Sequence, residues 1–258
     1  MTQPTLAHEI IGNGPEKVIV MGGWLGDHTV FQPIYPWLDR TTFTYCFADP
    51  RGYGASQSLV GNYTNSEAAG DVAALATSLG WETFHYIGHS MMGKVAQYLS
   101  AHYSTLLRSV IGVTPVPASA VPFDEEAHKL FATAWEVPAN RGTICMLTTG
   151  NRHTNVWEQY MVSESLRTTH PDAYRGYFQM WSTEDFAAEV DGCEVPFLAI
   201  TGEHDAGVPT ALVKDTILQW FKKAELHVMS NAGHYPMQEV PIQFVTTCEA
   251  FMSRYANG

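Results

Sequence analysis

The sequence is short of basic side chains. Lysine and arginine total 14 among 258 residues, against 26 aspartates and glutamates, so the formal net charge at pH 7 is −12. A partner such as nucleic acid or an anionic membrane normally requires a basic face, and we therefore expect neither. Long hydrophobic runs are missing too, since no stretch approaches the roughly 18 apolar residues of a membrane-spanning helix.

Paired cysteines are also missing. The four cysteines are far apart and form no Cys-x-x-Cys motif: Cys46, Cys145, Cys193 and Cys248. We interpret them as reduced core residues of a cytoplasmic protein. The N-terminal residues 1–4 are polar and no long apolar run follows them, so a signal peptide is not expected. There is no internal repeat.

What is present is a pattern of alternating strand-like and helix-like stretches. Hydrophobic residues make up 45% of the chain and charged residues 16%, which is typical of a globular protein. The alternation predicts an α/β fold, a mostly parallel twisted sheet with helices on both faces. We predict strands at residues 17–21, 44–48, 84–90, 109–114, 195–201 and 224–229, and helices at 65–79, 91–103, 210–221 and 242–255.

The middle of the chain follows another pattern. From Pro115 to about Asp191 the strand signal fades, and helix-like, aromatic-rich segments replace it. We predict a helical cap at residues 117–190, inserted between two parts of one α/β core at 1–116 and 191–258. If the cap covers a cleft, some of its aromatic residues face that cleft, and the candidates are Trp135, Trp157 and Trp181. For any single aromatic residue, simple packing of cap against core remains the alternative.

The stretch FHYIGHSMMG at residues 84–93 is the strongest local motif. An apolar run ends at a glycine, and a helix-like segment begins directly after Ser90. A serine at such a strand-to-helix corner presents its hydroxyl outside the sheet on a strained turn, and the N-terminus of the following helix points its free amides at it. The geometry suits a nucleophile, although an ordinary Gly-Ser turn is the alternative.

A serine nucleophile needs a base, and the base needs an acid. His234 follows the predicted strand at 224–229, and Asp205 follows the strand at 195–201. The carboxyl ends of parallel strands share one edge of the sheet, which is where Ser90 is also expected. Glu203 is the rival acid; we prefer Asp205 because it lies further beyond the strand end.

The glycine-rich stretch GGWLG at residues 22–26 follows the first predicted strand. Its amides could bend over the cleft and stabilise an oxyanion. We predict that the amides of Trp24 and Met91 are the two donors. Around them we expect four further residues to bind substrate: Gly23, His89, Met92 and Tyr235.

Over nearly its whole length the chain resembles the α/β-hydrolase superfamily. Five segments in the right order carry the resemblance: residues 22–24, 49–54, 88–93, 202–205 and 231–234. The resemblance implies a Ser-His-Asp hydrolase with a small helical cap and without metal or cofactor, similar to esterases, lactonases and carbon–carbon bond hydrolases. The serine at position 90 argues against the aspartate-dependent dehalogenases and epoxide hydrolases.

Two segments depart from the family pattern. The serine motif is usually Gly-x-Ser-x-Gly, and here Met92 occupies the second glycine position. Its side chain is expected to reshape the floor of the site. Many relatives have His-Gly where this chain has Gly22 and Gly23, which leaves the amides in place.

The main hypothesis is therefore a hydrolase that cleaves a small carboxylic ester or lactone with a sizeable apolar or aromatic part, through an acyl-enzyme on Ser90. One alternative uses the same triad to hydrolyse a carbon–carbon bond or to act as a lyase. Another is a non-catalytic small-molecule receptor on the same fold. The natural substrate and the oligomeric state do not follow from the sequence.

Overall fold

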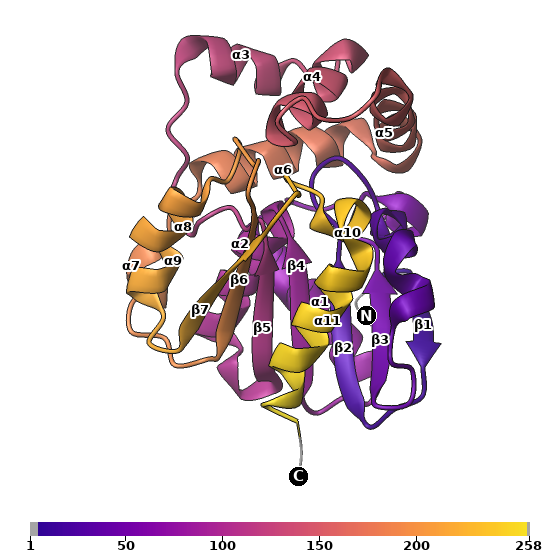
Figure 1. The fold of residues 1–258 in the computed structure, drawn as a ribbon, viewed down its shortest axis with the longest axis vertical. Helices are drawn as coiled ribbons and strands as arrows, with labels where there is room; N and C mark the ends of the chain where they lie inside the picture. Colours follow the sequence, from indigo (N-terminus) through magenta and orange to yellow (C-terminus); the bar gives the residue numbers. More distant parts are fainter. Residues whose placement is uncertain (1–4, 257–258) are drawn as a thin grey trace.

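A seven-stranded sheet forms the centre of the protein, in the order β1-β3-β2-β4-β5-β6-β7 (Figure 1). The computed structural model describes residues 5–256, so the polar residues 1–4, on which the expectation of no signal peptide partly rests, lie outside it. The predicted strands correspond to β2 (Glu16–Met21), β3 (Phe43–Ala48), β4 (Phe84–His89), β5 (Leu107–Val113), β6 (Phe197–Gly202) and β7 (Ala224–Met229). These strands run parallel. The predicted fold class is confirmed.

One strand was not predicted. β1 (His8–Gly12) pairs antiparallel with β3 at the edge of the sheet. Its first three residues are exposed, so it lacks the apolar run that marks a buried strand. In contrast, β3, β4 and β6 are buried at every position, because helices cover both faces of the sheet.

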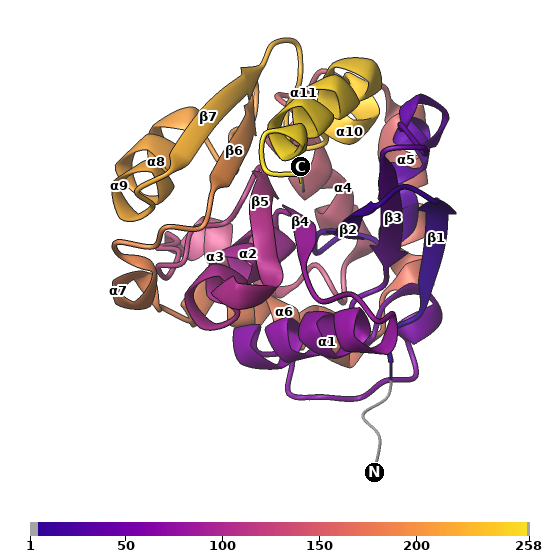
Figure 2. The same cartoon turned by 90° about the horizontal axis from the view of Figure 1, so that it is seen from below.

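Helices α1 (Asn65–Ser78) and α2 (Met91–His102) cover one face of the sheet, and α11 (Pro241–Ser253) covers the other (Figure 2). Thr64 caps α1 by accepting from the Glu67 amide at 3.1 Å. The short helix α10 (Pro236–Glu239) precedes α11.

The single helix predicted at residues 210–221 is wrong. It is two short helices, α8 (Thr210–Asp215) and α9 (Ile217–Trp220), separated by Thr216. The Thr216 hydroxyl donates to the carbonyl of Leu212 at 2.6 Å, and its backbone leaves the helical region at φ −124° and ψ −90°. A threonine hydroxyl that competes for the carbonyl four residues back favours such a break.

Four helices stand over the carboxyl edge of the sheet, and we call them the cap (Figure 1): α3 (Glu125–Ala132), α4 (Pro138–Thr148), α5 (Asn155–Thr168) and α6 (Pro171–Thr183). The next helix, α7 (Ala187–Val190), lies beside the body instead. Lys94 of α2 joins the two connections of the cap to the body. Its ammonium donates to the carbonyls of Ser119 (2.9 Å), Trp181 (3.1 Å) and Glu184 (2.6 Å).

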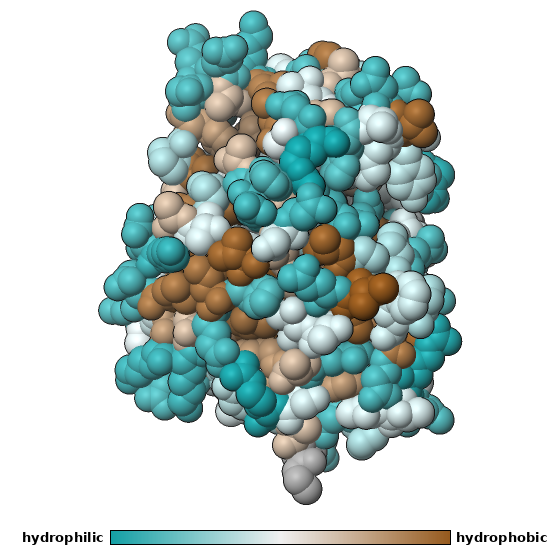
Figure 3. Space-filling model, viewed as in Figure 1, coloured by the Kyte–Doolittle hydropathy of each residue, from teal (hydrophilic) through white to brown (hydrophobic). Residues whose placement is uncertain are grey.

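The surface in the view of Figure 1 is mostly hydrophilic, with hydrophobic groups gathered at mid-height (Figure 3). Among residues 5–256, no helix has the length and apolar character needed to cross a membrane. The four cysteines are free thiols.

Candidate active site

Ser90 lies at the corner between β4 and α2. Its backbone has φ 53° and ψ −111°, a left-handed region that a residue with a Cβ rarely adopts. Two hydrogen bonds hold the corner: the Ser90 amide donates to the Val113 carbonyl at 2.8 Å, and the Gly93 amide donates to the Ser90 carbonyl at 2.9 Å. The strained turn predicted for the serine motif is therefore present.

Strand β4 and helix α2 approach each other closely at this corner, and glycines occupy the two positions with the least space. A Cβ at Gly88 would lie 2.2 Å from the Met92 carbonyl oxygen, and a Cβ at Gly93 would lie 2.6 Å from the Pro115 Cβ. Met92 itself is buried in the hydrophobic core. The expectation that its side chain reshapes the floor of the site is thus wrong, because Met92 packs in the core and does not line the cavity above Ser90.

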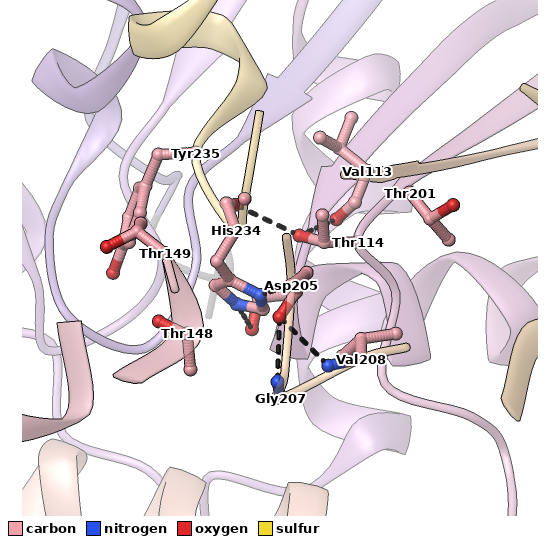
Figure 4. A network of polar contacts seen from close by, with 12 residues as sticks. Val113, Thr114, Thr148, Thr149, Thr201, Asp205, Gly207, Val208, His234 and Tyr235 are labelled. Atoms are coloured by element: carbon pink, nitrogen blue, oxygen red, sulfur yellow. Dashed lines mark hydrogen bonds and ion pairs between the residues drawn. The ribbon is translucent and has the colours of Figure 1, made fainter. Parts of the chain in front are cut away.

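Ser90, His234 and Asp205 form one chain of hydrogen bonds. His234 Nε2 lies 2.9 Å from Ser90 Oγ, and His234 Nδ1 lies 2.7 Å from Asp205 Oδ2. The second carboxylate oxygen of Asp205 accepts from the amides of Gly207 (2.8 Å) and Val208 (3.0 Å), as Figure 4 shows. All three side chains are buried. This arrangement favours the His234 tautomer that carries its proton on Nδ1 and can accept the serine proton on Nε2.

The loops that carry the acid and the base touch each other. A Cβ at Gly202, at the end of β6, would lie 2.1 Å from the Gly233 carbonyl oxygen, so only glycine allows this approach. The cap also contributes, because the His234 amide donates to the Thr148 carbonyl of α4 at 3.1 Å. The backbone around His234 is therefore held by both body and cap.

His89 and Gly23 border the serine. A Cβ at Gly23 would lie 2.7 Å from His89 Nδ1 and 3.0 Å from Ser90 Cβ, so the glycine-rich loop passes directly over the corner. Burial lowers the pKa of His89, and the neighbouring His234 lowers it further. The neutral ring donates from Nε2 to the His234 carbonyl at 2.9 Å.

A cavity of about 330 Å³ opens above Ser90, between cap and body. Its polar side chains are few: Ser90, His89, Thr148, His234 and Tyr235. Most of the lining is apolar and includes Trp24, Phe123, Phe131, Ile144, Trp181, Val208 and Leu212. No lysine, arginine, aspartate or glutamate of the described residues lines this cavity. A site of this kind suits an uncharged organic molecule.

Comparison with known proteins agrees with this geometry. Residues 17–239 match the family model described as alpha/beta hydrolase fold. The chain belongs to the α/β-hydrolase fold family. It is 25% identical over 207 residues to a non-heme haloperoxidase of Rhodococcus erythropolis, covering 72% of this chain and 73% of the relative. It is 22% identical over 253 residues to 3-oxoadipate enol-lactonase 2 of Acinetobacter baylyi, covering 97% of this chain and 94% of the relative.

Solved structures share the fold of this α/β-hydrolase. An esterase from Exiguobacterium antarcticum superposes with a TM-score of 0.85 at 19% identity, covering 96% of this chain and 95% of that one. The enol-lactonase from Burkholderia xenovorans superposes with a TM-score of 0.84 at 21% identity, covering 96% of both chains. At these identities the likeness concerns the fold alone.

The α/β-hydrolase cavity includes only some of the residues predicted to bind substrate. His89, Trp181 and Tyr235 line it, whereas Gly23 borders a smaller neighbouring cavity of about 20 Å³. Met92 is in the core, as described above. Two tryptophans also lie elsewhere because other groups hold them. The Arg175 guanidinium lies 4.5 Å from the Trp135 ring centroid, and Trp157 donates to Gln238 at 3.0 Å.

Sequence reasoning did not single out several residues of the cavity. Val208 and Leu212 follow the acid loop, and Ile144 and Thr148 share one face of α4. Aliphatic residues at these positions look like ordinary core residues, and no sequence signal distinguishes them. Only the approach of the cap to the body brings them together.

One group of side chains outside the large cavity has the composition of a metal site. Ligand atoms of Asp27, His28 and Asp49 all lie within 4.8 Å of one another. Three of the four carboxylate oxygens already accept hydrogen bonds, since Asp49 accepts from the His28 ring at 2.6 Å through Oδ1 and from the Ala55 amide at 2.8 Å through Oδ2. Asp27 likewise accepts from the Thr29 amide at 3.0 Å. We interpret this group as a hydrogen-bonded brace of the loop.

Proposed function

We propose that this protein hydrolyses a carboxylic ester or lactone through an acyl-enzyme on Ser90. The observation that supports this most directly is the buried chain from Ser90 through His234 to Asp205, which ends on two backbone amides at the floor of an apolar cavity. Relatives named as esterases and enol-lactonases share the fold.

The geometry suits general-base activation of the serine. His234 Nε2 accepts the Ser90 proton as Oγ bonds to the substrate carbonyl carbon, and the carbonyl electron pair moves onto its oxygen. The electron pair of the oxyanion then re-forms the carbonyl, the bond to the leaving oxygen breaks, and His234 gives the proton to the leaving oxygen. Water repeats the sequence on the acyl-enzyme, and Asp205 stabilises the imidazolium at both stages.

The proposed oxyanion donors are the amides of Met91 and Trp24. Met91 begins α2, and the first amides of a helix have no partner within the helix. Trp24 follows Gly23, whose lack of a side chain allows the loop to pass over Ser90. Each such donor is worth on the order of a hundredfold in kcat or more.

The cavity further supports an uncharged substrate with an apolar or aromatic part. A carboxylate placed in it would lose its hydration without meeting a cation, which is costly. We expect kcat/KM for phenyl butyrate to exceed that for monophenyl succinate by about a hundredfold or more. In Leu212→Arg, which adds a cation to the lining, this ratio should fall; a wild-type preference for the succinate would contradict the assignment.

Labelling with a fluorophosphonate probe tests the mechanism itself. The folded protein should be modified at Ser90, and the Ser90→Ala variant should remain unlabelled. The same variant should lose about a thousandfold or more in kcat. Absence of label on folded wild-type protein would refute the proposal.

Product analysis on a substrate offering both an ester and a 1,3-diketone would separate ester cleavage from carbon–carbon cleavage, which the same triad could perform.

A further inference from the structure

Trp24, whose amide we assign to the oxyanion, is held by two tyrosines from different parts of the molecule. Its carbonyl oxygen accepts a hydrogen bond from the Tyr53 hydroxyl at 2.9 Å. Its indole N–H donates to the backbone carbonyl of Tyr174 at 2.8 Å, and the two rings stack with their centroids 4.1 Å apart. Tyr53 belongs to the body and Tyr174 to cap helix α6, so the loop that carries Trp24 is attached to both.

Tyr174 is in turn held by Arg141 of cap helix α4. The Arg141 guanidinium carbon lies 4.1 Å from the Tyr174 ring centroid. The Trp24 ring centroid also lies 4.1 Å from the Tyr174 ring centroid. Two groups at that distance cannot occupy the same face of a ring, so Arg141 and Trp24 lie on opposite faces of Tyr174. Arg141 is only 3% exposed and donates to the Ala134 carbonyl and to the hydroxyls of Ser165 and Thr169. A buried guanidinium with these partners is costly to move.

The contacts close into a circuit. Thr169, which accepts from Arg141 at 3.0 Å, forms an antiparallel bridge with Tyr53. The neighbouring His170 amide donates to the Gly52 carbonyl at 2.9 Å. The circuit therefore runs from Tyr53 to Trp24, Tyr174, Arg141 and Thr169 and returns to Tyr53. Any displacement of α6 from the body must break a contact of Trp24.

We propose that this circuit positions the oxyanion hole, so that acyl transfer requires the cap to be seated on the body. The inference rests on the proposed function and adds a role for residues outside the cavity lining. Tyr53, Tyr174 and Arg141 are positioning residues, and they act on the reaction only through the peptide of Trp24. The effect is large because a donor must be preorganised, and a displacement of about 1 Å costs up to roughly a hundredfold in rate.

The test is Tyr53→Phe, which removes one hydroxyl and keeps the ring. We expect kcat to fall about tenfold while KM stays within about twofold, since the lost contact matters most when the oxyanion forms. An aryl trifluoromethyl ketone, which bonds to a serine Oγ and develops the same oxyanion, should bind about tenfold more weakly. The matching methyl ketone, which mimics the ground state, should bind as it does to wild type.

Inhibitor affinity separates positioning from a loss of folded protein, because misfolding lowers the maximal rate but leaves the inhibition constant of the folded fraction unchanged. The second variant is Trp24→Phe, which keeps the backbone amide and removes the indole donor. It should also bind the trifluoromethyl ketone more weakly than wild type does. The matched control is Tyr177→Phe, on α6, whose buried ring lies edge-on with its centroid 5.5 Å from that of Tyr53. It should leave both ketone affinities unchanged.

The outcomes distinguish this inference from the function on which it rests. If wild-type protein neither binds the trifluoromethyl ketone more tightly than the methyl ketone nor takes a fluorophosphonate label at Ser90, the proposed function fails. If wild type does both, but Tyr53→Phe and Trp24→Phe bind the trifluoromethyl ketone as tightly as wild type, only the positioning circuit is overturned.

Discussion

Glu203 and Asp205 lie two residues apart after β6, yet only Asp205 reaches His234. The Asp205 carboxylate is buried 2.7 Å from His234 Nδ1. The Glu203 side chain is 54% exposed and accepts from the Asn231 amide at 3.0 Å, which braces the base loop from outside. The two carboxylates therefore have different roles, one electrostatic and one structural.

Asp205→Asn should lower kcat on the order of ten-thousandfold. The amides of Gly207 and Val208 both donate to one oxygen of Asp205, so the amide oxygen of asparagine must stay there and its NH2 group must face His234. His234 Nδ1 would then have to accept, which places the ring proton on the wrong nitrogen. Steady-state kinetics on folded protein checks this. Glu203→Gln is the control, and an equal loss in that variant would contradict the distinction.

Met92→Gly, which restores the usual family pattern, should destabilise the protein by about 3 kcal/mol or more. The change removes a buried side chain and places glycine in the first turn of α2. Urea unfolding measures the effect, and Met92→Leu, which conserves volume, should cost less than about 1.5 kcal/mol. A glycine variant as stable as wild type would show that the site is strained by methionine.

Lys94→Met should lower the free energy of unfolding at pH 7 by about 2 kcal/mol or more, because three partly or fully buried backbone carbonyls lose their donor. Burial lowers the pKa of Lys94 to about 8 from its ordinary value of 10.5. Between these values the unfolded chain holds a proton that the folded chain has released, so this group stabilises the fold increasingly as pH rises.

The advantage of wild type over Lys94→Met should therefore grow between pH 8 and 10, by up to about 2 kcal/mol. Urea unfolding across this range measures it. An advantage that shrinks with rising pH would mean that the charged ammonium is the stabilising form.

His85, in β4, should make the protein sensitive to mild acid. It is fully buried, and its Nδ1 lies 2.8 Å from the Ser109 hydroxyl. Burial lowers the pKa of His85 below its ordinary value of 6.5, although Glu16 opposes the shift. The folded chain thus keeps His85 neutral where the unfolded chain binds a proton, and the stabilisation present above pH 6.5 is lost as pH falls.

His85→Asn should flatten the decline in the free energy of unfolding from pH 6.5 to 5, measured by urea titration. The exposed His128 of α3 provides the control. The free energy of unfolding of His128→Asn should decline with falling pH as steeply as that of wild type. An unchanged slope in His85→Asn would assign the acid sensitivity to other groups.

Local signals in the sequence determined the fold class and the parts of the site that follow strand ends. Ser90 directly follows β4, and Asp205 and His234 lie on the loops after β6 and β7. Because parallel strands end at one edge of the sheet, chain order alone predicted that the three residues would meet. The antiparallel β1 and the break at Thr216 were not predictable in this way. The first is an exposed edge strand, and the second depends on a side-chain hydrogen bond.

Tertiary structure alone decided which cap residues line the cavity, where the corner requires glycine, and how Trp24 is held. Trp181 faces the cavity while Trp135 and Trp157 pack elsewhere, although all three are tryptophans of the same segment. The bond from Trp24 to Tyr174 joins positions 150 residues apart. The physical reason is that residue type and local spacing determine conformation within an element, whereas contacts between distant elements depend on how the cap docks on the body.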